Sequence, residues 1–157
     1  MRTDTPTSPG GLVHISQWGS LRHAANVALV CLMASQLDLD KGLNEKFSLS
    51  QLNYMLGLGT GGGGHSFMVG FGVQPPERAH HAGSSCPSPP LACGWAALSS
   101  PGPNPQVLEG ALVGGPQAPD DGWEDDRENY VGNEVTLDYN AGFTSLLAGI
   151  IELKTFI

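Results

Sequence analysis

The chain has 157 residues, which is long enough for one domain with a hydrophobic core and too short for two domains of ordinary size. It carries 15 acidic and 7 basic residues, a formal net charge of -8. This charge argues against a nucleic-acid partner, because phosphate binding requires clustered Lys and Arg side chains.

Two helices are predicted in the N-terminal third of the chain. Across residues 15–37, apolar side chains recur every three or four positions and form one helical stripe: Trp18, Leu21, Ala25, Ala28 and Leu32. Cys31 lies in this stretch, where we expect a buried, unreactive thiol. The second helix is expected to begin near Ser48, which has capping-box spacing to Gln51, and to end at Gly57.

The middle of the chain is rich in residues that disfavour regular structure. The glycine tract at residues 57–65 cannot form a helix or strand interior, so we expect a mobile loop there. No Lys-Ser or Lys-Thr pair follows it, so we expect no nucleotide cofactor. Residues 66–73 are predicted to be extended. Residues 75–105 contain too much Pro, Gly and Ser for long elements, and a loop of this length is typical of a functional segment.

The loop at 75–105 contains the residue types of two different structural sites. Cys86 and Cys93 are close enough in sequence to form a local disulfide. Together with His80 and His81 they also suggest a zinc site. The spacing fits zinc poorly, because the metal prefers short paired spacings of four ligands, so we expect no metal. Trp95 in the same loop could pack in the core or serve as a platform for a ligand, and we expect core packing.

The C-terminal part combines an acidic segment with a third helix. Eight of the 15 acidic residues lie at positions 120–138, where Arg127 is the only basic residue. Such a run by itself is typical of a solvated loop. The helix is predicted from Asn133, as N-cap, to Ile151, so that Glu134 lies in its first turn. Its apolar stripe comprises Val135, Tyr139, Gly142, Leu146 and Ile150.

The acidic segment WEDDRENYVGNEVTLDYNAGF has the composition of a sugar-cleaving site. Glycoside hydrolysis needs a carboxylic acid to protonate the leaving oxygen, and aromatic side chains can stack on sugars. The segment resembles the C-terminal active-site signature of glycoside hydrolase family 9, matching its positions at Trp123, Asp125, Tyr130, Glu134, Thr136, Asn140 and Ala141. This resemblance implies that Glu134 is the general acid and that Asp125 helps to organise the site. It also implies that Tyr139 contacts the sugar.

Three further segments resemble the same family. SPGGLVHISQWGSLRHAANVALV looks like a segment whose Trp and Arg line the cleft, here Trp18 and Arg22, although Trp18 could equally be core. SFMVGFGVQPPERAHHAGSSCP looks like the histidine signature, whose active-site His corresponds to His80. CGWAALSSPGPNPQVLEGALVGGP reads like a loop in which animal members bridge the cysteine pair, here Cys86 and Cys93.

The resemblance implies an all-α fold in which residues 1–157 form about the last third of an (α/α)6 barrel with long irregular loops. Family members activate water with an Asp-Ala-Gly-Asp type motif near their N-terminus, which these 157 residues lack. We therefore expect a fragment of an animal-type cellulase that hydrolyses internal β-1,4-glucosidic bonds with inversion, inactive by itself. The alternative is a non-catalytic carbohydrate-binding or pseudoenzyme fragment.

The resemblance also implies a β-glucan partner and a secreted, extracellular location. The sequence has no stretch of eighteen apolar residues that would span a membrane, and its start, MRTDTPTSPGG, lacks the apolar core of a signal peptide. We therefore expect no membrane partner and no signal peptide within these residues.

The histidine motif departs from the family pattern at three positions. Gln74 stands where a basic residue or Asn is usual, Ala79 where Pro is usual, and Ala82 where Arg is usual. The third change matters most, because the planar guanidinium of Arg donates several hydrogen bonds to sugar hydroxyls and Ala donates none. The resemblance therefore implies weakened substrate affinity.

Overall fold

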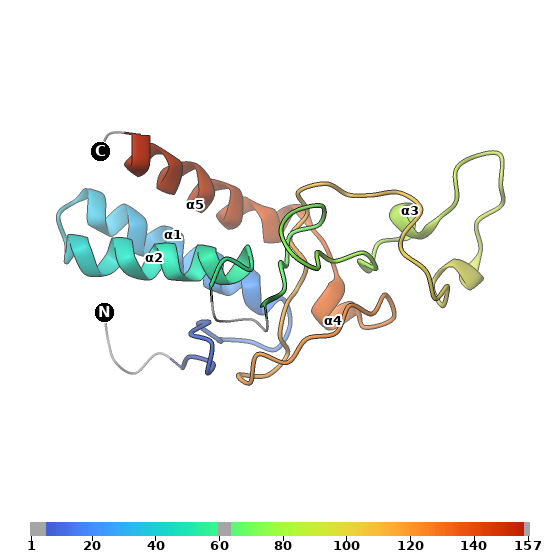
Figure 1. The fold of residues 1–157 in the computed structure, drawn as a ribbon, viewed down its shortest axis with the longest axis horizontal. Helices are drawn as coiled ribbons and strands as arrows, with labels where there is room; N and C mark the ends of the chain where they lie inside the picture. Colours follow the sequence, from blue (N-terminus) through green and yellow to red (C-terminus); the bar gives the residue numbers. More distant parts are fainter. Residues whose placement is uncertain (1–5, 60–63, 156–157) are drawn as a thin grey trace.

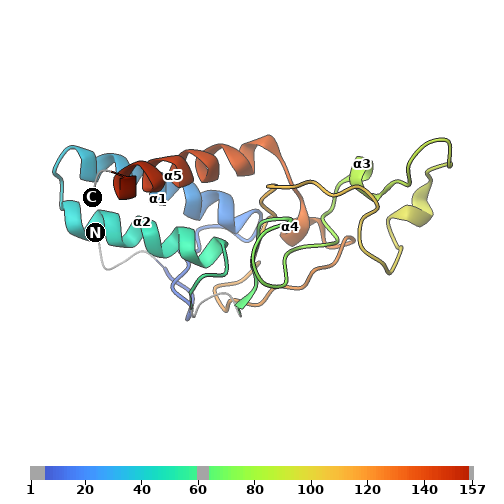
Figure 2. The same ribbon diagram turned by 45° about the horizontal axis from the view of Figure 1, so that its top comes forward.

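Figure 1 shows the computed structural model, which describes residues 6–59 and 64–155. Three long helices lie side by side at one end of the molecule, and irregular segments extend from them toward the opposite end, where α3 lies (Figures 1 and 2). The described residues contain helices and isolated β-bridges but no strand. The centre of the glycine tract, expected to be a mobile loop, lies outside the described residues.

The first predicted helix is confirmed as α1, Ser20–Gln36. It begins later than expected because Gly19 adopts a left-handed conformation with φ 61°, which leaves Trp18 before the helix. Four of the five predicted apolar residues are buried: Leu21, Ala25, Ala28 and Leu32. Cys31 is only partly buried, which corrects the expectation of a buried thiol, although burial still raises its pKa.

The second helix, α2, spans Lys41–Met55 and begins seven residues before the predicted start. Ser48 is therefore in mid-helix, and the capping-box prediction is wrong. Its buried hydroxyl donates to the carbonyl of Ala28 at 2.8 Å, while the Gln51 side chain accepts from the N–H of Val13 at 2.9 Å. These polar residues face the protein interior, which obscured the apolar period. The helix ends just before Gly57, at φ 68°, close to the predicted end.

The last predicted helix is divided in two. A short helix, α4, covers Tyr130–Asn133, and the long helix α5 covers Leu137–Thr155. Asn133 does not cap α5, because its buried side chain donates to the carbonyl of Glu124 at 2.9 Å. Thr136 caps α5 by accepting from the N–H of Tyr139 at 3.1 Å. The predicted stripe is largely correct, since Tyr139, Leu146 and Ile150 are all buried.

Helix α1 packs extensively against both α2 and α5, which have few contacts with each other. The three helices share one hydrophobic core with the loops that bring Phe67 and Val113 against them. Their outer faces carry large exposed apolar side chains, among them Val30, Met33 and Leu43. Within the described residues, no helix is both long and apolar enough to cross a membrane.

The central segments follow the predicted irregular pattern. Residues 66–73 form a turn that is closed by the Ser66 N–H and the Val73 carbonyl at 3.0 Å, and Met68 alone pairs with Leu112. This segment is therefore less extended than expected. Residues 75–105 contain only two short elements, α3 at Ala82–Ser85 and η2 at Trp95–Ala97.

Candidate active site

Glu134 lies at the junction between α4 and α5 rather than in the first turn of a helix. It is the C-cap residue of α4, with an extended backbone at φ -60° and ψ 145°. Its Oε2 accepts hydrogen bonds from the Trp18 indole N–H at 3.0 Å and from the Tyr139 hydroxyl at 3.2 Å. The segment before α1 and the first turn of α5 therefore hold this carboxylate together.

Aromatic side chains form a surface beside Glu134. The rings of Trp18 and Tyr130 lie 5.3 Å apart, and the two residues are about half exposed, at 43% and 48%. Trp18 is therefore not a core residue. Tyr130 also contacts the edge of His80, with 6.0 Å between ring centroids. Flat, half-exposed rings next to a carboxylate provide both an apolar platform and a proton-exchanging group.

Arg22 approaches the site from α1. Its Nη1 donates to Asp138 at 2.7 Å, and its guanidinium lies 5.2 Å from the centre of the Tyr139 ring. Burial lowers the pKa of the neighbouring His23, and the charge of Arg22 lowers it further, while Asp138 opposes both. Arg22 thus braces Tyr139 and has a carboxylate partner of its own.

Tyr139 is buried, and its hydroxyl lies beside the Glu134 carboxylate. Burial, the negative charge of Glu134 and the hydrogen bond to Glu134 raise the pKa of Tyr139 to about 12. The phenol therefore remains a hydrogen-bond donor at all ordinary pH values. Gly19 is required beside it, because a Cβ there would come within 2.7 Å of the Tyr139 ring.

His80 is tied to the acid-bearing segment at two points. Its backbone N–H donates to the carbonyl of Asn133 at 2.8 Å, and a parallel bridge pairs His80 with Glu134. Its Nδ1 lies 2.7 Å from the carbonyl of Arg127, which can only accept, so Nδ1 carries a proton. In the neutral ring this leaves Nε2 as an acceptor for a ligand hydroxyl.

Asp125 lies in the acidic loop and binds backbone rather than a reacting group. Its two carboxylate oxygens accept from the N–H groups of Glu77 and Arg78, at 2.8 and 3.1 Å. These residues lead directly to His80. Asp125 therefore connects the acidic loop to the segment that precedes His80.

Arg127 is a structural residue of this region that the sequence reasoning did not identify. It is buried, and its guanidinium donates to the Asn104 side chain at 2.5 Å and to the carbonyls of Ser100 and Gly102 at 2.6 and 2.7 Å. Its own carbonyl holds His80. The signal was its position as the only basic residue in a highly acidic segment.

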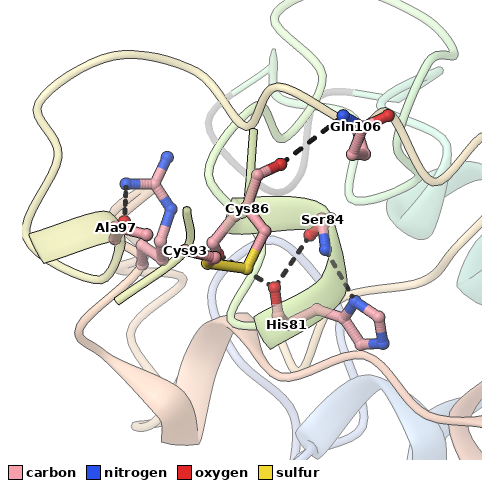
Figure 3. Close-up of a disulfide and its surroundings, with 8 residues drawn as sticks. His81, Ser84, Cys86, Cys93, Ala97 and Gln106 are labelled. Carbon is pink, nitrogen blue, oxygen red and sulfur yellow. Dashed lines mark hydrogen bonds between the residues drawn. A yellow bond between two sulfur atoms is a disulfide. The ribbon is translucent and has the colours of Figure 1, made fainter. Parts of the chain in front are cut away.

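Cys86 and Cys93 form a disulfide with Cα atoms 5.3 Å apart (Figure 3). The two sulfur atoms are bonded to each other, so neither is a free thiolate that could bind zinc. His81 instead caps α3 by accepting from the N–H of Ser84 at 3.1 Å. Trp95 is 90% exposed, which corrects the expectation that it packs in the core.

A family model described as glycosyl hydrolase family 9 matches residues 1–147. The chain belongs to this family. Endoglucanase B of Cellulomonas fimi is 42% identical over 153 residues, which are 94% of this chain and 14% of that protein. Endoglucanase A of Bacillus pumilus is 39% identical over 151 residues, covering 93% of this chain and 21% of that protein.

Solved structures of family 9 proteins have the same fold. The endoglucanase of the termite Nasutitermes takasagoensis superposes with a TM-score of 0.90 at 48% identity, over 97% of this chain and 34% of the termite chain. Endoglucanase CelQ from Clostridium thermocellum, complexed with cellobiose and cellotriose, gives a TM-score of 0.74 at 38% identity, over 91% of this chain and 23% of CelQ.

These likenesses establish the predicted fold class. Family 9 endoglucanases are (α/α)6 barrels, and the helices described above form part of one. The chain spans between about a seventh and a third of the length of these relatives. The family 9 relatives named here are endoglucanases, and their general activity is the hydrolysis of cellulose or related glucans.

Proposed function

We propose that residues 1–157 are the acid-bearing part of a family 9 catalytic domain. That domain hydrolyses internal β-1,4-glucosidic bonds of cellulose or a related glucan with inversion, and Glu134 is its general acid. One observation carries the proposal: the Trp18 and Tyr139 donors both bind Oε2 of Glu134, at 3.0 and 3.2 Å. Within residues 6–59 and 64–155 no protein group donates to Oε1, which is the oxygen that carries and delivers the proton.

The surrounding residues have roles consistent with this chemistry. The exposed rings of Trp18 and Tyr130 offer the apolar faces on which a sugar stacks next to the acid. Nε2 of His80 accepts from a sugar hydroxyl, while Arg22 braces Tyr139. Asp125 positions the segment that precedes His80. The related CelQ in complex with cellobiose and cellotriose supports a glucan as ligand.

Protonation of the leaving oxygen is half of the reaction. Inversion also requires a carboxylate base that activates water, about 6.5 to 9.5 Å from the acid. The 157 residues contain no Asp-Ala-Gly-Asp type motif, from which the family takes this base. The 157-residue chain by itself is therefore expected to hydrolyse glucans negligibly.

The alternative function is non-catalytic glucan binding. The feature that favours it is the combination of a preserved aromatic surface at Trp18 and Tyr130 with the lack of an Asp-Ala-Gly-Asp type motif in these 157 residues. A module that only binds glucan needs the aromatic surface and does not need the carboxylate base that activates water. Oligosaccharide binding without turnover in a complete domain would identify this function.

The proposed location is extracellular. A disulfide between Cys86 and Cys93 suits an oxidising compartment, because cytosolic thiols are kept reduced. Mass spectrometry of non-reduced peptides from secreted protein tests this point, and two free thiols would contradict it.

The test of catalysis uses a complete domain in which this chain replaces the matching third of the termite endoglucanase. Glu134→Gln keeps the shape of the side chain and removes the acid, so release of reducing sugar should fall about 10²- to 10⁴-fold. Glu128→Gln, an exposed neighbour, is the matched control and should leave the rate unchanged.

The same assay on the 157-residue chain alone tests whether the acid can act without a base from outside these residues. We expect no turnover above background. Robust turnover that disappears in Glu134→Gln would overturn the dependence on a base outside this chain, and would require a base among Asp120, Asp121, Asp125 and Asp126.

A further inference from the structure

A pocket of about 400 Å³ lies in the disulfide loop, beyond the contacts of Glu134. Its lining includes His80, Ala82, Cys86, Cys93, Trp95 and Leu98. His80 also contacts Tyr130 of the aromatic surface beside Glu134. The pocket therefore shares His80 with the candidate active site and has its other lining residues in the disulfide loop.

Trp95 is the unusual side chain of this pocket. It is 90% exposed, so the indole contributes little to the stability of the loop that carries it. An indole exposed beside a pocket is free to stack on the apolar face of a ligand, and its N–H remains available as a donor.

The backbone around Trp95 is held by specific contacts. Trp95 is the first residue of the short helix η2, Trp95–Ala97, and follows the disulfide cysteine Cys93 by two residues. On its other side, Nη1 of the buried Arg127 donates to the carbonyl of Ala97 at 3.2 Å (Figure 3 shows the disulfide and Ala97). A bridge and a buried cation thus fix a segment whose ring is open to solvent, which is an arrangement that prepares the ring for a ligand.

The chemistry of the lining selects a neutral ligand with a flat apolar face. Among the residues that the structure describes, no Asp, Glu, Lys or Arg lines the pocket. The small residues Gly94 and Ala97 leave room beside the indole, and Nε2 of His80 offers a hydrogen-bond acceptor at one end. A β-linked glucose unit has an apolar C–H face for the ring and hydroxyl groups for the acceptor.

We propose that this pocket is an outer sugar-binding subsite, in which Trp95 stacks on a unit of the same glucan chain whose scissile bond lies at Glu134. The inference rests on the proposed function, because its occupant is the proposed substrate. It assigns to the disulfide loop a share of the affinity for long glucan chains. Since Ala82 supplies no guanidinium, stacking on Trp95 provides binding that does not depend on charge.

The test measures binding of cellohexaose to the 157-residue chain by titration calorimetry, on the monomeric fraction. Trp95→Leu removes the ring and should weaken binding about 2- to 10-fold, whereas Trp95→Tyr keeps a stacking ring and should retain most of the affinity. Leu91→Ala is the matched control, because Leu91 is an exposed apolar residue of the same loop that does not line the pocket. It should have no effect.

A folding defect in the variants can be distinguished from a loss of ligand binding. Trp95 is exposed, so circular dichroism of the variants should match that of the parent. Equal affinity of Trp95→Leu and the parent would overturn the subsite, as would equal Trp95-dependent binding of maltohexaose, whose α-linked chain is not flat. Absence of any cellohexaose binding by the parent would also overturn it.

Failure of the subsite and failure of the proposed function give different results. Trp95→Leu should weaken binding of cellohexaose to the chain if the subsite exists, whereas Glu134→Gln should abolish hydrolysis in the complete domain if the proposed function holds. Loss of binding in Trp95→Leu together with full hydrolysis by Glu134→Gln would reject the acid and keep the subsite. Unchanged binding in Trp95→Leu together with loss of hydrolysis in Glu134→Gln would reject the subsite and keep the acid.

Discussion

The three-helix region and the loop region of this protein are stabilised in different ways. Helices α1, α2 and α5 bury an apolar stripe, in which Leu21, Met55 and Leu146 are fully inaccessible. Burial of such side chains removes apolar area from water, worth about 1.5 to 3 kcal/mol for each. This stabilisation is non-directional and depends on shape and volume.

The loop region at residues 75–136 depends on directed polar contacts. Arg127 satisfies the Asn104 side chain and several carbonyls, Asp125 binds two backbone N–H groups, and the Cys86–Cys93 disulfide closes the outer loop. Such contacts fix positions accurately, but each loses its stabilising effect when one partner is removed. The candidate site lies between the two regions, since Trp18 and Tyr139 come from the helical side and His80 from the loops.

Removal of core volume should have the largest effect on stability and should act through the helical region. Leu146→Ala leaves a cavity in the buried face of α5, and we expect the free energy of unfolding to fall by about 2 to 5 kcal/mol. Leu137→Ala changes the same residue type in the same helix at a position that is 93% exposed, and should change it by less than about 0.5 kcal/mol. Urea unfolding of both variants measures the difference, and equal losses would contradict the assigned core.

Replacement of Arg127 should disturb the loop region and spare the helices. Arg127→Met leaves Asn104 and the carbonyls of Ser100 and Gly102 without their donor, which we expect to cost about 3 kcal/mol. Hydrogen exchange should accelerate across residues 97–104 and remain slow in α1. Glu128→Gln is the exposed neighbouring control. Uniform acceleration over the whole chain would show that the two regions do not respond separately.

Restoring the usual residue at Ala82 should strengthen ligand binding without affecting the core. Ala82 is exposed at the start of α3, so Arg fits there, and its charged hydrogen bonds to sugar hydroxyls are worth about 1.5 to 3 kcal/mol. Calorimetry with cello-oligosaccharides on the complete chimeric domain should record this gain for Ala82→Arg. Ala82→Lys, which has charge without the planar group, should gain less. No gain for Arg would show that the family role does not transfer to this position.

The smallest effect concerns pH at the junction of the two regions. The pKa of Tyr139 is raised to about 12 in the folded protein, against about 10 in an unfolded chain. Its contribution to stability is therefore complete below about pH 10 and is lost as the pH rises through about 12. Absorbance titration at 295 nm, parent minus Tyr139→Phe, should isolate a component with a midpoint near 12. A midpoint near 10 would contradict both the burial of the Tyr139 phenol and its contact with Glu134.

The sequence predicted the helical region well where apolar residues follow the helical period. It located α1 and the buried stripe of α5, because these faces are continuous and unbroken. It failed at the start of α2, where Ser48 and Gln51 point inward and bond to distant backbone groups. Periodicity cannot recognise a polar residue whose partner lies 20 or more residues away in sequence.

For the site, the sequence alone determined the residue types and the family, because a signature spanning Trp123 to Ala141 depends only on order and spacing. The tertiary structure decided which groups meet. Trp18 reaches Glu134 across 116 positions, and Trp95 is exposed rather than buried. The break between α4 and α5, which places Glu134 outside any helix, also comes from contacts of Asn133 with the acidic loop. Long-range hydrogen bonds set these positions, and local sequence carries no record of their geometry.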